Sequence, residues 1–207
     1  MPLLLAVRRA AQLYLGLFVS ALGIVLTLRA ELGAGPWDVL HKGLADTTGM
    51  SFGLVVQLVG AVVLVLGLLL GVRPGFGTIS NLVFIGVFAN LLLRTPVGEV
   101  GDALVWRATV LLVGVASVGV GAALYIGAHY GPGPRDGMMV ALHTRLGWSI
   151  GWARALVEAT ALLGGIALGG PVGAGTVVFA LGIGPATQAA FTVLRMTPVR
   201  ETTAEPI

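Results

Sequence analysis

Six long apolar stretches limit the folds open to this chain more than any other feature of its sequence. They cover approximately residues 11–28, 53–72, 78–93, 106–127, 150–168 and 176–194, and each is bounded by charged residues, Gly or Pro. A helix needs about 20 mostly apolar residues to cross a hydrocarbon core. Because lipid offers a backbone no hydrogen-bond partners, such stretches fold as α-helices. The pattern predicts an all-α polytopic membrane bundle with six transmembrane helices.

The overall composition excludes a soluble globular protein. Hydrophobic residues make up 57% of the 207 residues and charged residues only 10%, against roughly 25% charged residues in a soluble domain. The net charge of +3 comes mainly from arginines near the ends of the apolar stretches, so we interpret it as topology information rather than as a nucleic-acid-binding surface. The chain has no cysteine, which excludes disulfides and thiolate metal sites.

An internal repeat divides the chain into two halves. Residues 1–98 align without a gap on residues 99–196, and 28 of the 98 positions are identical, eleven of them glycines. This predicts a first three-span repeat over 1–98, a second over 99–196, and a disordered cytoplasmic tail over 197–207, within one membrane domain. Because three spans are an odd number, the second half should enter the membrane from the opposite side, as an inverted-topology repeat.

A short segment after the first span of each half carries the clearest repeated motif. Residues 33–49 and 131–147 each predict a short helix, with Pro in its first turn and Asp near the positive end of its dipole. The helix could be re-entrant, with its N-terminal amides lining a solute path, or it could lie in the membrane interface and brace the bundle. The repeated residues are Gly33, Gly35, Pro36 and Asp38 in the first copy and Gly131, Gly133, Pro134 and Asp136 in the second.

A second repeated motif, Gly-x-Gly-Thr, precedes the third span of each half. Glycines there permit close approach of helices, and the threonine can cap the span or form a hydrogen bond to a neighbouring helix. A phosphate cradle is not expected, since the lysine of a P-loop is missing. The residues are Gly75, Gly77 and Thr78 in the first half and Gly173, Gly175 and Thr176 in the second.

Ionisable residues inside a span are costly and therefore mark candidate functional sites. Arg154 and Glu158 stand four residues apart in the fifth span and should form an ion pair, and Glu158 aligns with Gly60, so it breaks the repeat. The pair could alternatively fix the rotation of the helix without any chemistry. Uncharged polar residues could line the same path or join helices. The predicted substrate or ion path comprises Glu158, Arg154, Asp38, Asp136, Asn81, Gln57, Asn90 and Gln188.

No catalytic or cofactor motif accompanies these residues. The three histidines, His41, His129 and His143, lie in connections that we interpret as interfacial, and their spacing matches no metal motif. We therefore expect no enzyme activity, no metal and no cofactor. Seven basic residues on one side of the predicted spans against four on the other favour cytoplasmic N- and C-termini.

The repeated Gly-x-Gly-Pro-x-Asp segment, in its fuller copy Gly33-Ala-Gly-Pro-Trp-Asp-Val-Leu-His-Lys-Gly-Leu44, and the later Gly75-Phe-Gly-Thr78 resemble the YczE/YitT-type family of bacterial integral membrane proteins. The resemblance covers roughly residues 8 to 195. It implies a multi-pass protein of the bacterial plasma membrane and supplies no catalytic or ligand residues. The second copy departs from the pattern, with Arg135 for Trp37 and Met139 for His41.

Two functions compete at this stage. One is a small secondary transporter or exporter of an unidentified small solute, with its site between the two repeats. The other is a non-transporting membrane factor that stabilises or regulates a partner protein through glycine-lined helix faces. The first predicts a polar cavity and the second a packed, dry interior. The expected partners are the lipid bilayer and a small solute, with a homo-oligomer or a membrane partner as a further option, and no nucleic acid.

Overall fold

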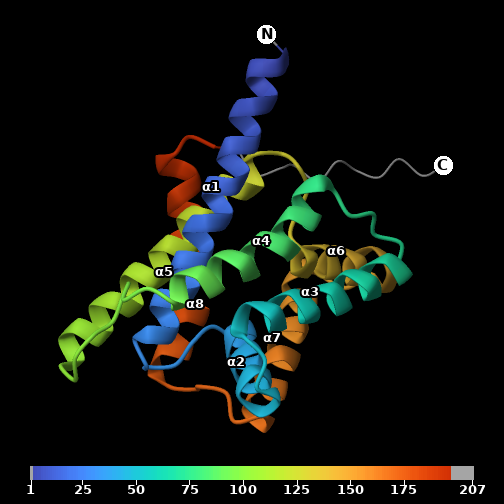
Figure 1. The fold of residues 1–207 in the computed structure, drawn as a ribbon. Helices are drawn as coiled ribbons and strands as arrows, with labels where there is room; N and C mark the ends of the chain where they lie inside the picture. Colours follow the sequence, from blue (N-terminus) through green and yellow to red (C-terminus); the bar gives the residue numbers. More distant parts are fainter. Residues whose placement is uncertain (1, 197–207) are drawn as a thin grey trace.

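The computed structural model describes residues 2–196, which fold into eight α-helices and no strand (Figure 1). This confirms the all-α prediction. Six of these helices, all except α2 and α6, are long and apolar enough to cross a membrane. The predicted disordered tail, residues 197–207, lies outside the described residues. The helices are α1 (Pro2–Arg29), α2 (Pro36–Thr48), α3 (Phe52–Leu69), α4 (Phe76–Leu93), α5 (Leu104–Gly127), α6 (Pro134–Leu146), α7 (Ile150–Ala167) and α8 (Ala174–Val193).

The first span is the one whose predicted start was wrong. We placed it at residue 11, after the paired arginines, but α1 begins at Pro2 and runs through Arg8 and Arg9 without a break. Arginine is a good helix former, so the two charges do not interrupt the helix. The other five spans start and end within a few residues of their predicted limits.

Helices α1 and α5 pack together through glycines at the centre of the bundle. A Cβ atom on Gly16 would lie 2.8 Å from the carbonyl oxygen of Gly121, and one on Gly23 would lie 2.6 Å from that of Gly114. Because the earlier glycine of α1 meets the later glycine of α5, the two helices run in opposite directions. Small residues let the two backbones approach closely, as is usual where membrane helices pack.

The two short helices form where the repeated motif predicts them. Both α2 and α6 contain 13 residues, begin with Pro after an extended Gly, and end at glycines in the left-handed region, Gly49 with φ 72° and Gly147 with φ 68°. Helix α2 packs mainly against α7, and α6 packs mainly against α3. Each short helix is therefore supported chiefly by a long helix of the other half of the chain.

The Gly-x-Gly-Thr motifs make matching contacts between the halves. The Gly77 N–H donates to the Tyr130 carbonyl at 2.7 Å, and the Gly175 N–H donates to the Leu32 carbonyl at 2.6 Å. These two bonds join positions that correspond under the 98-residue shift. In addition, the hydroxyls of Thr78 and Thr176 accept from the N–H three residues earlier, at 3.1 and 3.2 Å, and so cap α4 and α8.

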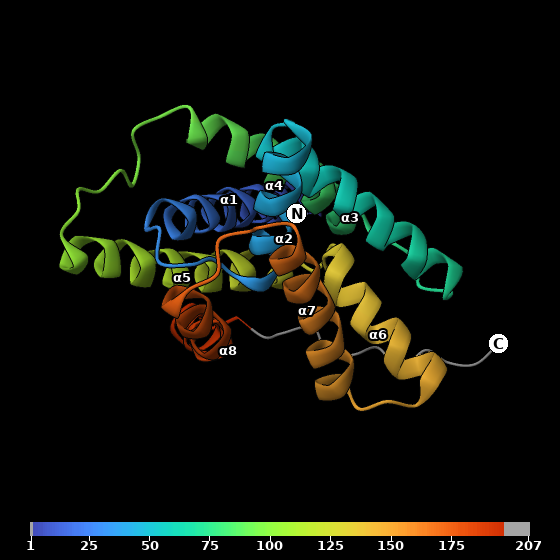
Figure 2. The same ribbon diagram turned by 90° about the horizontal axis from the view of Figure 1, so that it is seen from below.

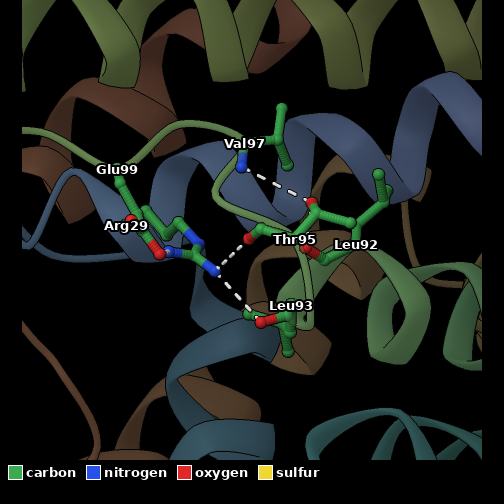
Figure 3. Close-up of polar contacts among 6 residues, drawn as sticks. All are labelled: Arg29, Leu92, Leu93, Thr95, Val97 and Glu99. Atoms are coloured by element: carbon green, nitrogen blue, oxygen red, sulfur yellow. Dashed lines mark hydrogen bonds and ion pairs between the residues drawn. The ribbon is translucent and has the colours of Figure 1, made fainter.

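Arginines hold the connection between α4 and α5 against the end of α1. The Arg29 guanidinium donates to the carbonyls of Leu93 at 3.0 Å and Thr95 at 2.7 Å, and it forms an ion pair with Glu99 at 2.5 Å (Figure 3). Arg107, near the start of α5, donates to the Ala30 carbonyl at 2.9 Å. Charged side chains thus replace the missing helix partners of carbonyls at the ends of α1 and α4.

Equivalent helix pairs in the two halves differ in their packing. Helices α3 and α4 meet at Gly53 and Gly86, where the backbone of each glycine touches the other. The corresponding residues of α7 and α8 are Gly151 and Gly184, and no described atom lies within 4 Å of a Cβ built on Gly184. Helices α7 and α8 lie apart (Figures 1 and 2).

The glycine contact between α1 and α5 should dominate stability. A Cβ at position 16 would lie 2.5 Å from the Tyr125 backbone nitrogen, so Gly16→Ala forces the helices apart. We expect it to lower the free energy of unfolding by about 1–3 kcal/mol, measured by SDS titration in mixed micelles. The matched control is Gly67→Ala in α3, where no described atom lies within 4 Å. That variant should be neutral or up to about 1 kcal/mol more stable. Equal effects of the two variants would contradict the prediction.

Candidate functional site

A cavity of about 180 Å³ lies where the two short helices meet. Residues from all eight helices line it, and the first turns of α2 and α6 both face it. Many of the lining residues occur in pairs 98 positions apart, such as Pro36 with Pro134 and Ile85 with Ile183. The cavity therefore lies where equivalent parts of the two halves come together.

Trp37 and Arg135 occupy equivalent positions in the two motifs and touch each other across the cavity. The Arg135 guanidinium carbon lies 4.6 Å from the centre of the Trp37 ring, which is a cation–π contact. The contact joins the first turns of α2 and α6. It therefore brings two positive helix ends and one guanidinium close together at the cavity.

Asp38 supplies a buried carboxylate next to this contact. Its exposed fraction is 3%, and its Oδ1 atom has no hydrogen-bond partner within residues 2–196. The Nδ1 atom of His41 is 3.5 Å from this oxygen, but it too is without a hydrogen bond in the described part of the chain. Burial lowers the pKa of His41, although Asp38 partly opposes the shift. The imidazole is therefore neutral at pH 7 and forms no ion pair with Asp38.

The remaining charged groups of the cavity have partners. The Tyr125 hydroxyl donates to Asp136 Oδ2 at 3.1 Å. As predicted, Arg154 and Glu158 form an ion pair, with Arg154 Nε 3.0 Å from Glu158 Oε1. The side chains of this pair are 50% and 26% exposed, so it forms a partly exposed part of the cavity lining.

The structure brings together five of the eight residues predicted for a solute path. These are Asp38, Asn81, Asp136, Arg154 and Glu158, all of which line the cavity. The other three, Gln57, Asn90 and Gln188, lie away from it.

The three residues outside the cavity take other positions. Gln57 Nε2 donates to the Val83 carbonyl at 2.8 Å and so joins α3 to α4. Asn90 also bonds across these two helices, whereas Gln188 is exposed on α8. An isolated polar residue in a span is compatible with either role, which is why the sequence did not separate the two groups.

Sequence reasoning missed five residues at the cavity whose side chains carry polar atoms. We interpreted His41 as interfacial and left it out of the predicted path, but it lies in the cavity lining with only 1% of its surface exposed. Trp37 and Arg135 carried a signal, since they are the variable position of an otherwise repeated motif. No group of three His, Asp or Glu side chains in residues 2–196 is arranged to hold a metal ion. The missed residues are Ser20, Trp37, His41, Tyr125 and Arg135.

The chain is similar to a known protein family and to several bacterial proteins. Residues 7–191 match the model of a family of unknown function, DUF6198. An uncharacterised protein of Haemophilus influenzae is 36% identical over 90% of this chain and 84% of its own length. The uncharacterised membrane protein YczE of Bacillus subtilis is 32% identical over 81% of this chain and 78% of its own length. No solved structure matches. The chain is thus a membrane protein with six candidate spans, its predicted resemblance to YczE is confirmed, and it belongs to the DUF6198 family.

Proposed function

We propose that this protein is a secondary transporter of a small solute, built from two inverted repeats that open and close a shared cavity in turn. The observation that carries the proposal is the difference between equivalent helix pairs. Helices α3 and α4 touch at Gly53 and Gly86, while α7 and α8 are apart at Gly151 and Gly184. In an inverted repeat, exchanging these two arrangements reopens the cavity to the opposite side.

Polar side chains at the same helix ends support this exchange. Asn90 accepts from the Gly53 N–H at 2.8 Å and donates to Ser51 Oγ at 3.1 Å, which fastens α4 to the start of α3. The corresponding residue on α8 is Gln188, and the corresponding start of α7 contains Ser149. Ser149 Oγ accepts instead from the Trp152 N–H of its own helix, at 3.3 Å. Gln188 therefore has the chemistry to fasten α8 to α7 in the other arrangement.

The antiparallel contact of α1 and α5 supplies a pivot. It joins Gly16 to Gly121 and Gly23 to Gly114, and these two contacts exchange with each other under the 98-residue shift. The same contact can therefore persist in both arrangements while α3, α4, α7 and α8 move. Two states that differ by swapping equivalent contacts are expected to lie close in free energy, which is what alternating access needs.

The cavity favours transport over the alternative, a non-transporting factor that stabilises a partner protein. That alternative predicts a packed, dry interior. The observed cavity has a volume of about 180 Å³, and Asp38 places an unpartnered carboxylate oxygen in its wall within the described structure. Buried polar atoms without partners are costly, so a cavity lined by them is suited to bind water or a solute.

Paired cysteines test the exchange, and the absence of native cysteine makes them specific. Ser51→Cys with Asn90→Cys should cross-link in membranes with a short bifunctional thiol reagent, since these side chains touch. Ser149→Cys with Gln188→Cys lie apart here but should cross-link once the other arrangement is populated. In a variant with all four cysteines, formation of one cross-link should suppress the other. The readout is mass spectrometry of the linked peptides.

Single-cysteine variants at the four positions are the controls and should give no intramolecular link. If the second pair never cross-links while the first does so completely, alternating access is contradicted. Recovery of a partner protein in fixed stoichiometry, together with that result, would favour the non-transporting factor.

Glu158 is the residue that we expect to couple the exchange to protons, because it is a carboxylate within a candidate span and lines the cavity. Protonation would break its ion pair with Arg154. The ratio of the two cross-links should then change with pH, and Glu158→Gln should abolish that change. The control is Glu99→Gln, which removes a carboxylate paired with Arg29 outside the cavity. An unaltered pH profile in Glu158→Gln would remove Glu158 from the mechanism. The other ionisable groups that line the cavity are Asp38, His41, Tyr125, Arg135 and Asp136.

A further inference from the structure

Two opposite charges line the cavity, and in the part of the chain that the structure describes neither has a charged partner within 4 Å. One is the Asp38 carboxylate, whose exposed fraction is 3% and whose Oδ1 has only the neutral His41 ring nearby. The other is the Arg135 guanidinium, which lies over the face of the Trp37 ring. The neighbouring charges of Asp136 and of the Arg154–Glu158 pair are hydrogen-bonded. The free groups are therefore one anion and one cation.

This arrangement is costly unless something binds to it. A buried charge without a partner destabilises a protein strongly. Arg135 and the Asp38 oxygen could have satisfied each other, yet no ion pair joins them among residues 2–196. The space between such groups fits a ligand that carries the complementary charges itself.

The chemistry of each group specifies one end of the ligand. An ammonium group can donate to the free oxygen of Asp38. A carboxylate can accept two parallel hydrogen bonds from the Arg135 guanidinium, the geometry in which arginine binds carboxylates best. The first turns of α2 and α6 add their positive dipole ends beside Arg135 and favour the same negative group.

The size and the remaining walls specify the rest of the ligand. The cavity volume of about 180 Å³ is slightly larger than the roughly 150 Å³ apolar cavity that accommodates benzene. This is room for a molecule the size of a single amino acid. Apolar side chains from α3, α4 and α6 complete the lining, among them Val56, Val63, Ile85 and Met139.

We propose that the cavity binds a small zwitterionic solute of the amino-acid class, with its ammonium group on Asp38 and its carboxylate on Arg135. This inference rests on the proposed transport function and names its substrate class. The uncharged part of the solute lies against the apolar walls.

Binding to the purified protein in lipid nanodiscs tests the substrate class. The twenty standard L-amino acids are screened by thermal stabilisation, and the strongest is titrated by calorimetry beside two analogues, the amine without its carboxylate and the acid without its amine. We expect the amino acid to bind at least tenfold more tightly than either analogue. If no amino acid binds, or if one analogue binds as well as the parent, the proposal is overturned.

Two variants test the roles of the charges. Asp38→Asn should lower the affinity for the amino acid at least tenfold and leave the affinity for the acid analogue unchanged. Arg135→Gln should lower the affinity for the amino acid and for the acid analogue, but not for the amine. The matched control is Asp46→Asn, which makes the same change on α2 at an exposed carboxylate paired with Lys42, outside the cavity. It should bind like the wild type.

Cross-linking separates this proposal from the transport proposal. Each variant is combined with the Ser51→Cys and Asn90→Cys pair, whose link shows that the bundle is folded. A folded Asp38→Asn protein with unchanged amino-acid affinity overturns the assignment of Asp38. If the two cross-links still exchange while no zwitterion binds, the substrate class is wrong and transport of another solute stands. If an amino acid binds but the two cross-links do not exchange, the transport proposal is contradicted instead.

Discussion

The close approach of α1 and α5 is the contact on which the rest of the bundle depends. Glycines spaced seven apart, at 16 and 23 in one helix and at 114 and 121 in the other, allow the two backbones to touch. Every other long helix except α3 and α7 packs against this pair, with α4 on α1 and α8 on α5. The cavity lies between the first turns of α2 and α6, where Arg135 contacts Trp37.

A repeated scaffold encloses a cavity whose chemistry is not repeated. Equivalent positions line both walls, but Trp37 faces Arg135, His41 corresponds to Met139, Gly60 to Glu158 and Asn81 to Phe179. The positions that line the cavity therefore recur in both halves, while several of their side chains have diverged. A symmetric site could bind only a ligand that presents the same face to both halves. The divergence places a cation, Arg135, in one half only, opposite Trp37 of the other half, which suits an asymmetric ligand.

The sequence predicted the features that come from hydrophobicity and glycine, and it missed those that depend on burial. Six spans, both short helices and the ion pair of Arg154 with Glu158 follow from periodicity, motif and spacing, and the structure has all of them. The burial of His41 and the approach of Arg135 to Trp37 did not follow. Both depend on α2 and α6 being packed inside the bundle, and the same amphipathic pattern also fits a helix lying on the membrane surface. The local sequence pattern does not distinguish these two positions. They are distinguished by the tertiary contacts of α2 with α7 and of α6 with α3.

The unequal packing of the halves has a physical origin in a few substitutions. Asn90 is short enough to bridge Ser51 and Gly53 directly, beside the tight contact between the glycines of α3 and α4. Its counterpart Gln188 has one more methylene, and α8 contains Pro185, which has no N–H to donate to the preceding turn of the helix. A longer side chain costs more conformational entropy to immobilise, and a helix with a missing bond bends more readily. Both differences weaken the closing of α7 on α8 relative to that of α3 on α4. The structure accordingly has α3 and α4 together and α7 and α8 apart. In the proposed transport cycle, a ligand that binds both Asp38 and Arg135 supplies the free energy that closes α7 on α8.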